Sequence, residues 1–194
     1  MKIAVYSGSF NPLHIGHLAI IRHMIEEAGF DMVYLIVSPK NPLKDGISAT
    51  TGQDRYNAAI EAVRRHFGNR AAASQPYSKV KVDDIELNMP EPHYTVRTLK
   101  ALKEREPENS FTFVMGADNL ADIRRWRDYA TILKDFSVAV FPREGHNLMQ
   151  IKQDLLTEDP AYKIQILKAE LVNISSTQIR EAIANGDDPS KYLM

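Results

Sequence analysis

Short continuous runs of apolar residues alternate along the chain with longer segments in which apolar residues recur every three or four positions. Such runs are typical of strands buried on both faces of a parallel sheet, and the periodic segments are typical of helices with one apolar face. The runs cover residues 3–6, 32–37, 111–115 and 137–141. The succession of strand, helix and strand within the first forty residues predicts a right-handed βαβ unit, and therefore an α/β protein with a parallel sheet.

Helices are predicted wherever the apolar spacing is three to four residues. They cover residues 15–28, 54–67, 95–104, 148–156 and 176–184. Their predicted inner faces are Leu18, Ile21 and Ile25; Tyr56, Ile60, Val63 and Phe67; Val96, Leu99 and Leu102; and Ile179, Ala182 and Ile183. Two weaker strand signals lie between them: an alternating one formed by Val80, Val82 and residues 85–87, and one or two short strands within residues 163–172.

The turn between the first strand and the first helix has the sequence GSFNPLHIGH, residues 8–17. Gly8 and Ser9 suit a tight turn, and Pro12 disfavours helix before Leu13, so the helix should begin near Ile15 or Gly16. Free N–H groups and the positive end of the helix dipole make such a helix start a site for anions, above all phosphate. His14 and His17 continue the inner stripe of the helix at its open end, so both imidazoles should lie side by side at the edge of the sheet.

The histidine pair is also compatible with two simpler roles. A histidine at a helix start is most often an ordinary solvated or hydrogen-bonded residue, and a charged one is disfavoured there by the dipole. A pair spaced by three could also bind zinc, but no third ligand lies near in the sequence and there is no HExxH motif, so no metal site is predicted.

A second polar helix start is predicted near the end of the chain. Ser175 followed by Gln178 fits a capping box, although Ser176 can also be the cap, and Asn185 with Gly186 ends the helix. A plain cap would account for these hydroxyl residues without any function. A helix start that carries hydroxyls and Arg180 is also suited to hold the β- and γ-phosphates of a nucleotide.

Other candidates follow the predicted strands and so fall on the carboxyl edge of the sheet, where ligands of open α/β sheets bind. Gly116 would allow close approach of a ligand, and Asp118 would accept from a ribose hydroxyl or hold a cation's water shell, although Asp-Asn is also a common turn former. Trp126 has arginines on both sides and would suit stacking on a flat, electron-poor ring, although a lone tryptophan is more often part of the core. Arg143 falls on the same edge.

Three further residues remain ambiguous at this level. Thr95 begins a helix beside the expected cleft and is either a simple cap or part of a site with free N–H groups. Lys44, like Lys40, lies on a loop after the second strand, where lysines are usually solvated, but its position suits a phosphate. Arg55 is either a clamp on a loop or an exposed helix residue.

Composition limits the class of protein further. A length of 194 residues, 44% apolar and 25% charged, predicts one soluble domain, residues 1–194. The net charge of −1 does not provide the basic field that a nucleic-acid polymer requires, and no apolar run is long enough for a membrane span. The absence of cysteine excludes disulfides and thiol chemistry, so a cytoplasmic location is expected. Whether the chain forms a homo-oligomer stays open.

The motifs resemble those of one superfamily. GSFNPLHIGH resembles the HxGH signature of nucleotidyltransferases, Gly-[Ser/Thr]-Phe-[Asp/Asn]-Pro-x-His-x-Gly-His, and ISSTQIR at residues 174–180 resembles the superfamily's second motif. Two distant motifs in the right order are stronger evidence than either one. The chain further resembles the bacterial nicotinate-nucleotide adenylyltransferase family at Asn41-Pro42, Tyr94-Thr95-x-x-Thr98-Leu99, Gly116-Ala117-Asp118, Arg125-Trp126 and Arg143.

This resemblance implies a Rossmann-like open parallel sheet with helices on both faces, of the nucleotidyltransferase type. It implies an enzyme of NAD biosynthesis that joins ATP to nicotinate mononucleotide with Mg²⁺, giving deamido-NAD and pyrophosphate. The catalytic residues implied are His14, His17 and Arg180. The ATP site implied contains Gly8, Ser9, Phe10, His14, His17, Gly116, Asp118, Ser175, Ser176, Thr177 and Arg180. The mononucleotide site implied contains Lys44 for the phosphate, Tyr94 and Thr95 for the carboxylate, Trp126 for the ring, and Arg143.

The chain departs from the family pattern at two places, which leaves the ion pairing around residue 97 and the C-terminal cap open. Arg97 stands where the family usually has Asp, and the chain stops at Met194, where relatives commonly continue through a Pro and a short helix.

Other transferases of the same fold, acting on nicotinamide mononucleotide, phosphopantetheine or flavin mononucleotide, are the nearest alternative. A nucleotide-binding regulator without catalysis is the alternative of a different class, whereas the lack of GxGxxG and GxxxxGK[ST] argues against a dehydrogenase or a P-loop protein.

Overall fold

A six-stranded parallel sheet forms the centre of the computed structural model, which describes residues 1–39, 50–68, 79–168 and 175–194. The strands are β1 (Lys2–Gly8), β2 (Met32–Val37), β3 (Val80–Asp83), β4 (Ser110–Gly116), β5 (Val138–Phe141) and β6 (Ile164–Ile166). Their order is β3-β2-β1-β4-β5-β6, and every pairing is parallel. The order reverses between β1 and β4, which is where open sheets of this kind bind ligands.

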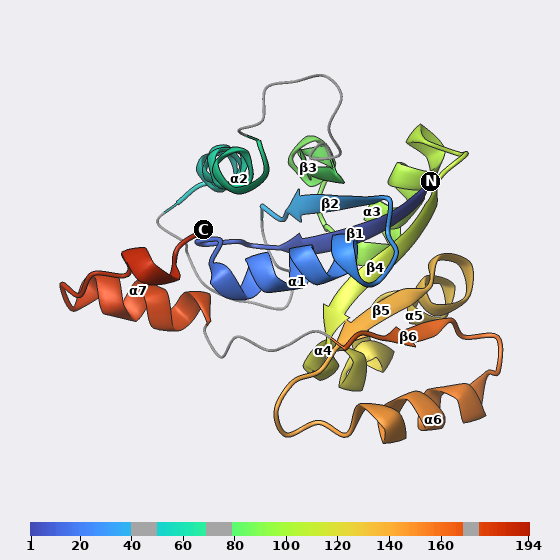
Figure 1. The fold of residues 1–194 in the computed structure, drawn as a ribbon. Helices are drawn as coiled ribbons and strands as arrows, with labels where there is room; N and C mark the ends of the chain where they lie inside the picture. The colour runs from blue at the N-terminus through green and yellow to red at the C-terminus, as the bar shows by residue number, and fades with distance from the viewer. Residues whose placement is uncertain (40–49, 69–78, 169–174) are drawn as a thin grey trace.

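Helices cover both faces of the sheet (Figure 1). The α-helices are α1 (Ile15–Glu26), α2 (Gly52–Phe67), α3 (Thr95–Arg105), α4 (Ala117–Ala121), α5 (Tyr129–Thr131), α6 (Leu148–Glu158) and α7 (Ser176–Ala184). Shorter turns are η2 (Ile85–Asn88), η3 (Ile123–Arg125), η4 (Ile132–Phe136) and η5 (Ser190–Tyr192). Alternate residues of β1 feed two cores, because Ile3 and Val5 pack with α3, α4 and α6, whereas Ala4 and Tyr6 pack with α1 and α2. The predicted Rossmann-like open sheet is therefore confirmed.

Two sequence predictions about this framework are wrong. Residues 85–87 form a 3₁₀ turn rather than a strand, because the Asp83 carboxylate accepts from the N–H of Ile85 and the Asp84 carbonyl accepts from Leu87. On α2 only Ile60 departs from the predicted inner face, since it is 37% exposed. The other predicted residues, Tyr56, Val63 and Phe67, pack against the core, and Arg55, Ala59 and Ala62 are buried as well.

The helix α7 also differs from its predicted packing. Ile179 is buried, but Ile183 is 51% exposed and Ala182 only partly buried. Its predicted start and end are confirmed, because Ser175 caps it with a capping box and Asn185 and Gly186 follow its last turn. Side-chain hydrogen bonds run from the first two turns of this helix to the turn between β1 and α1, through Ser176 and Arg180.

A membrane-spanning helix has to be both long and apolar. Within the described ranges, no helix is long and apolar enough to cross a membrane.

Candidate active site

The turn from β1 to α1 has the geometry expected from its sequence. The helix begins at Ile15, as predicted. A Cβ at Gly8 would lie 3.0 Å from the ring of Phe10, so a side chain there would press against this ring. The backbone of Phe10 has a positive φ of 43°. Its side chain is buried, and the ring packs edge to face against the His17 ring, with 5.2 Å between the centroids. The Phe10 side chain therefore packs against the histidine pair, whereas its backbone forms part of the turn.

The rings of His14 and His17 lie next to each other, tilted by 37°, with centroids 3.8 Å apart. His14 is the N-cap of α1, and its Nδ1 accepts from the N–H of Gly16 at 3.2 Å. The Nδ1 of His17 accepts from the N–H of His14, also at 3.2 Å. A neutral imidazole that accepts at Nδ1 carries its proton on Nε2, so both rings have an N–H group left to donate.

The two imidazoles are neutral at physiological pH. Burial lowers the pKa of His14 to about 4, and the nearby Arg143 acts in the same direction. Burial, His14 and Arg143 together hold the pKa of His17 well below its usual range. The pair can therefore act on an anion through hydrogen bonds from Nε2 rather than through full charges.

The burial of His14 leads to a prediction about stability. The unfolded chain, with a histidine pKa near 6.5, binds the proton first as the pH falls, because the folded pKa is about 4. The stability contributed by neutral His14 is therefore complete above about pH 6.5 and is lost as the pH falls towards 4. His14→Asn keeps an N-cap acceptor but cannot titrate, so its melting temperature should fall less over this range in circular dichroism melts. Parallel curves for the variant and the wild type would contradict the assignment.

The second helix start meets the first one, as predicted. The Ser176 hydroxyl donates to the Pro12 carbonyl at 3.1 Å, and Arg180 donates to the Asn11 carbonyl at 2.8 Å. Arg180 also donates to the Thr177 hydroxyl at 3.0 Å, so its guanidinium lies over the first turn of α7. These bonds join residues that are more than 160 positions apart in the sequence. Two helix N-termini, one with paired imidazoles and one with hydroxyls and a guanidinium, therefore share one edge of the molecule.

The end of the chain covers part of this edge. Leu193 pairs with His14 in an antiparallel bridge, and the N–H of Met194 donates to the Leu13 carbonyl at 3.4 Å. As a result only 5% of His14 is exposed, whereas His17 is partly open. Of the two histidines, His17 is the more accessible to a ligand.

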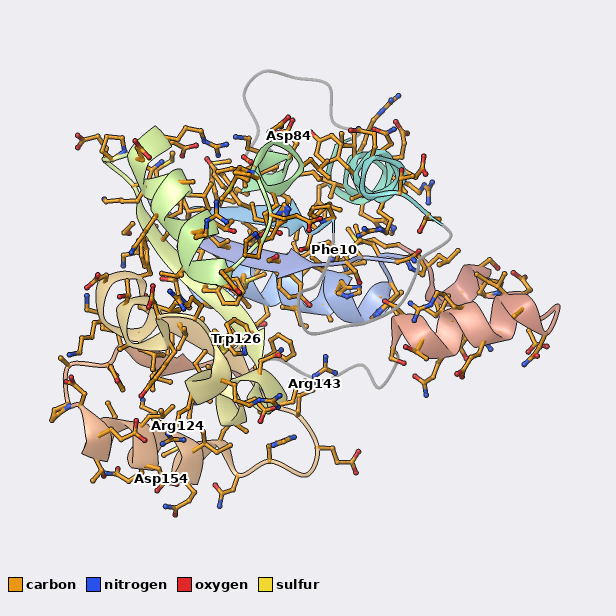
Figure 2. The ribbon with its side chains drawn as sticks, turned by 180° about the vertical axis from the view of Figure 1, so that it is seen from behind. Phe10, Asp84, Arg124, Trp126, Arg143 and Asp154 are labelled. Carbon is orange, nitrogen blue, oxygen red and sulfur yellow. The ribbon has the colours of Figure 1, made fainter. Side chains whose placement is uncertain are left out.

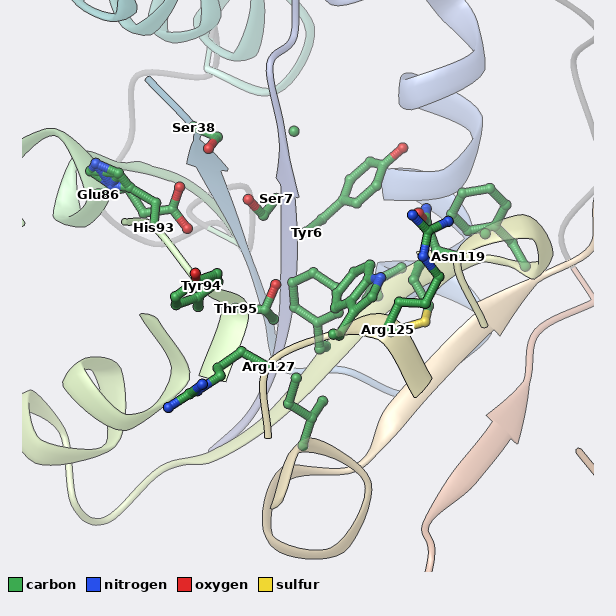
Figure 3. Close-up of a pocket in the computed structure, with 18 of the residues that line it drawn as sticks. Tyr6, Ser7, Ser38, Glu86, His93, Tyr94, Thr95, Asn119, Arg125 and Arg127 are labelled. Atoms are coloured by element: carbon green, nitrogen blue, oxygen red, sulfur yellow. The ribbon is translucent and has the colours of Figure 1, made fainter. Parts of the chain in front are cut away.

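A cavity of about 270 Å³ opens beside the histidine pair, at the carboxyl ends of β1 and β4 (Figure 3). The predicted residues that line it are Gly8, Tyr94, Thr95, Gly116, Trp126 and Arg143. Tyr94 and Thr95, at the start of α3, lie on one side, and Arg125 and Asn119 lie on the other (Figure 3). Tyr6 connects the cavity to the histidines, because it lines the former and its ring centroid is 6.0 Å from that of His17.

Trp126 and Arg143 form the aromatic and cationic part of this cavity (Figure 2). The Trp126 ring is partly exposed and packs edge to face against Phe113 at 5.8 Å, which holds its plane in place. The Arg143 guanidinium lies 5.1 Å from the centre of the Phe141 ring and 3.9 Å from an oxygen of Asp118. Both charged side chains are about half exposed, so they remain open to a ligand.

A side chain at Gly116 would displace its neighbours. A Cβ there would collide with the Asp118 carboxylate and lie 3.2 Å from the Phe141 ring and 3.3 Å from Arg143. The backbone at the end of β4 therefore stays open to the cavity, as the sequence indicated.

Several lining residues were not identified from the sequence. Glu86 accepts from the Thr98 hydroxyl at 2.7 Å through Oε1, while its Oε2 has no partner among the described residues. His93 is also buried, and its Nδ1 likewise lacks a partner there. Asn119 and Arg127 complete this group, and Arg125, which the sequence marked only as part of the Arg125-Trp126 motif, also lines the cavity. Glu86 looked like part of a strand and His93 like part of a loop, so no local pattern marked them.

Some predicted residues cannot be placed. Lys40, Asn41, Pro42 and Lys44 lie outside the described residues, and so does Ile174 of the second motif.

Comparisons with known proteins identify the class of enzyme that has this fold and site. The family described as cytidylyltransferase-like matches residues 5–182. The chain therefore belongs to the cytidylyltransferase-like family, which confirms the predicted nucleotidyltransferase. Full-length relatives narrow the class to the nicotinate-nucleotide adenylyltransferases, the function predicted from the sequence.

Two relatives come from flavobacteria, and each is named a probable nicotinate-nucleotide adenylyltransferase. That of Flavobacterium johnsoniae is 38% identical over 193 residues, covering 100% of this chain and 92% of the relative. That of Flavobacterium psychrophilum is 42% identical over 185 residues, covering 95% of this chain and 88% of the relative. Among solved structures, Plasmodium falciparum nicotinic acid mononucleotide adenylyltransferase complexed with NaAD superposes with a TM-score of 0.75. The superposition covers 99% of this chain and 90% of the Plasmodium chain, and the two sequences are 22% identical. The match therefore supports the fold.

Proposed function

We propose that this chain transfers the adenylyl group of ATP to nicotinate mononucleotide, releasing pyrophosphate and forming deamido-NAD. The observation that carries the proposal is the junction of two helix N-termini through Ser176 and Arg180, directly beside a cavity with an aromatic wall. The two helix N-termini suit a triphosphate, and the cavity with its aromatic wall suits a flat ring.

The triphosphate is proposed to lie across the two helix starts. His14 and His17 donate from Nε2, Arg180 supplies charge, and the backbone N–H groups of both first turns face the phosphates. The remaining residues proposed for the ATP site are Gly8, Ser9, Phe10, Gly116, Asp118, Ser175, Ser176 and Thr177.

The mononucleotide is proposed to occupy the cavity. Its pyridine ring stacks on Trp126, and its carboxylate accepts hydrogen bonds from backbone N–H groups at the start of α3, near Tyr94 and Thr95. Arg143 attracts the phosphates at the junction of the two sites, and Lys44 is proposed for the mononucleotide phosphate.

The reaction needs no protein nucleophile. An oxygen of the mononucleotide phosphate, already an anion, attacks the α-phosphorus of ATP, and the bond from that phosphorus to the bridging oxygen breaks in line, so the electron pair leaves with pyrophosphate. The chain contributes by holding the two phosphates in line and by placing hydrogen-bond donors and positive charge where charge develops. The residues proposed for this role are His14, His17 and Arg180, on the support of their positions at the two helix starts.

Magnesium fits this scheme as an ion that arrives with ATP. No cluster of three or more metal-ligating side chains exists in the part of the chain that the structure describes, whereas Asp118 offers one carboxylate at the cleft. An ion held chiefly by phosphate oxygens, with Asp118 on its water shell, matches this donor set, because Mg²⁺ in phosphate sites commonly keeps several waters. When bound, it neutralises charge on the phosphates. A cytoplasmic location and a single domain stay predictions, and the oligomeric state stays open.

Pyrophosphate release from ATP tests this proposal. We expect nicotinate mononucleotide to support release with the highest kcat/KM among four acceptors, the others being nicotinamide mononucleotide, phosphopantetheine and flavin mononucleotide. A higher value with another acceptor would assign a different substrate to the same fold. If ATP binds but no acceptor supports release, the proposal of catalysis is wrong and a nucleotide-binding regulator replaces it.

A further inference from the structure

Arg55 is the most deeply buried arginine that the structure describes, at 5% exposure. It lies one turn into α2, and its guanidinium points into the edge of the sheet rather than into solvent. One terminal nitrogen donates to the Ser9 carbonyl at 2.6 Å and to the Ser38 carbonyl at 2.8 Å. The other donates to the Pro39 carbonyl at 2.9 Å. Of the two interpretations left open by the sequence, the loop clamp is therefore confirmed.

The three carbonyls belong to two different loops. Ser9 lies in the turn that carries the histidine pair, whereas Ser38 and Pro39 follow β2. Parallel neighbours β1 and β2 end at the same edge, so a single planar guanidinium sets the separation of these loops. The start of α2 is itself fixed by the Thr51 capping box and by Gly52, where a Cβ would lie 3.1 Å from Pro39.

Arg55 also brings a positive charge into the edge of the sheet. Within the described ranges, no carboxylate forms an ion pair with it, and its Nε has no hydrogen-bond partner. Burial lowers the pKa of Arg55, but a guanidinium stays charged at neutral pH. A charge held away from water acts over a longer range than an exposed one, so it favours a polyanion in the adjacent turn.

We propose that Arg55 is a positioning residue for adenylyl transfer, which fixes the histidine-bearing turn against the loop after β2 and places a buried positive charge beside the bound phosphates. This inference rests on the proposed position of the triphosphate at that turn. It adds a residue from α2, outside both sequence motifs, to the machinery of the site.

Three variants separate the parts of this role. Arg55→Met removes both the charge and the three bonds. Arg55→Lys keeps the charge but cannot reach three carbonyls with a planar fork. Arg64→Met is the matched control, because Arg64 lies on the same helix, with its side chain 73% exposed and 3.6 Å from Glu61. The measurements are kcat and KM for ATP and for the mononucleotide, together with melting temperature, at a temperature at which each variant is folded.

We expect Arg55→Met to lower kcat at least about tenfold and to raise KM for ATP, since small displacements of reacting groups are costly. Arg55→Lys should have a KM for ATP close to the wild type but a kcat still reduced severalfold, and Arg64→Met should change neither. If Arg55→Met does not fold, Arg55→Lys alone decides. Wild-type kcat and KM in Arg55→Lys, or a lower melting temperature in Arg55→Met with unchanged kcat and KM, would overturn the inference. Failure of the wild type to use any mononucleotide would instead refute the proposed function.

Discussion

Replacing His17 by alanine should lower kcat by roughly a hundredfold or more, while KM for ATP changes little. His17 is the more open member of the pair, and its Nε2–H is free to donate towards the phosphates because Nδ1 is occupied by the N–H of His14. A donor aimed at charge that develops only in the transition state is worth about 3 to 4 kcal/mol in the barrier. Steady-state kinetics with ATP and nicotinate mononucleotide measure the split between kcat and KM.

His17→Gln is the control for helix capping. His17 occupies the third position of α1, where a glutamine can also reach back to the N-cap N–H, so this variant keeps the cap and loses the imidazole. It should be about as slow as His17→Ala but more stable to heat. His66→Ala, an exposed histidine on α2, should have wild-type kinetics. Equal losses in kcat and in affinity for ATP would show that His17 merely binds the nucleotide.

Arg180→Ala should lower kcat/KM by about a hundredfold. The guanidinium both attracts the phosphates and holds the Asn11 carbonyl of the first motif at 2.8 Å, so its removal loosens the junction of the two helix starts. Because the charge matters most on the leaving pyrophosphate, the larger share of the loss should appear in kcat.

Two companion variants make this result interpretable. Arg180→Lys keeps the charge and should recover part of the activity, whereas Glu181→Ala, the next residue on the same exposed helix, should behave as the wild type. Activity of Arg180→Ala within about twofold of the wild type would remove Arg180 from the proposed catalytic residues.

The location of the anion-binding turn could be predicted because its causes are local. Gly8 and Pro12 determine where the strand ends and where α1 begins, and the apolar stripe of α1 determines which way the histidines point. The Ser175 capping box is local in the same way. Their meeting could be expected only from the resemblance, since the bonds that join them span most of the chain.

Predictions failed where the environment of a residue depends on distant neighbours. The alternation of residues 80–87 is that of a strand, but the Asp83 carboxylate bonds to Ile85 and to Arg105, so the segment turns into η2 instead. Ile60 fits a helical stripe, yet α2 meets the sheet through Ala59 and Ala62, because which face is buried depends on what packs against it.

Local preferences were enough to predict the succession of the main strands and helices along the chain and the residue types at the two helix starts, because backbone preferences and apolar periodicity act over a few residues. Which of these residues meet depends on the folded chain. Folding pairs His14 with Leu193, makes Arg55 a clamp between two loops, and places Glu86 and His93 in the wall of the cavity. Contacts between distant segments depend on how the whole chain packs, and no local pattern records them.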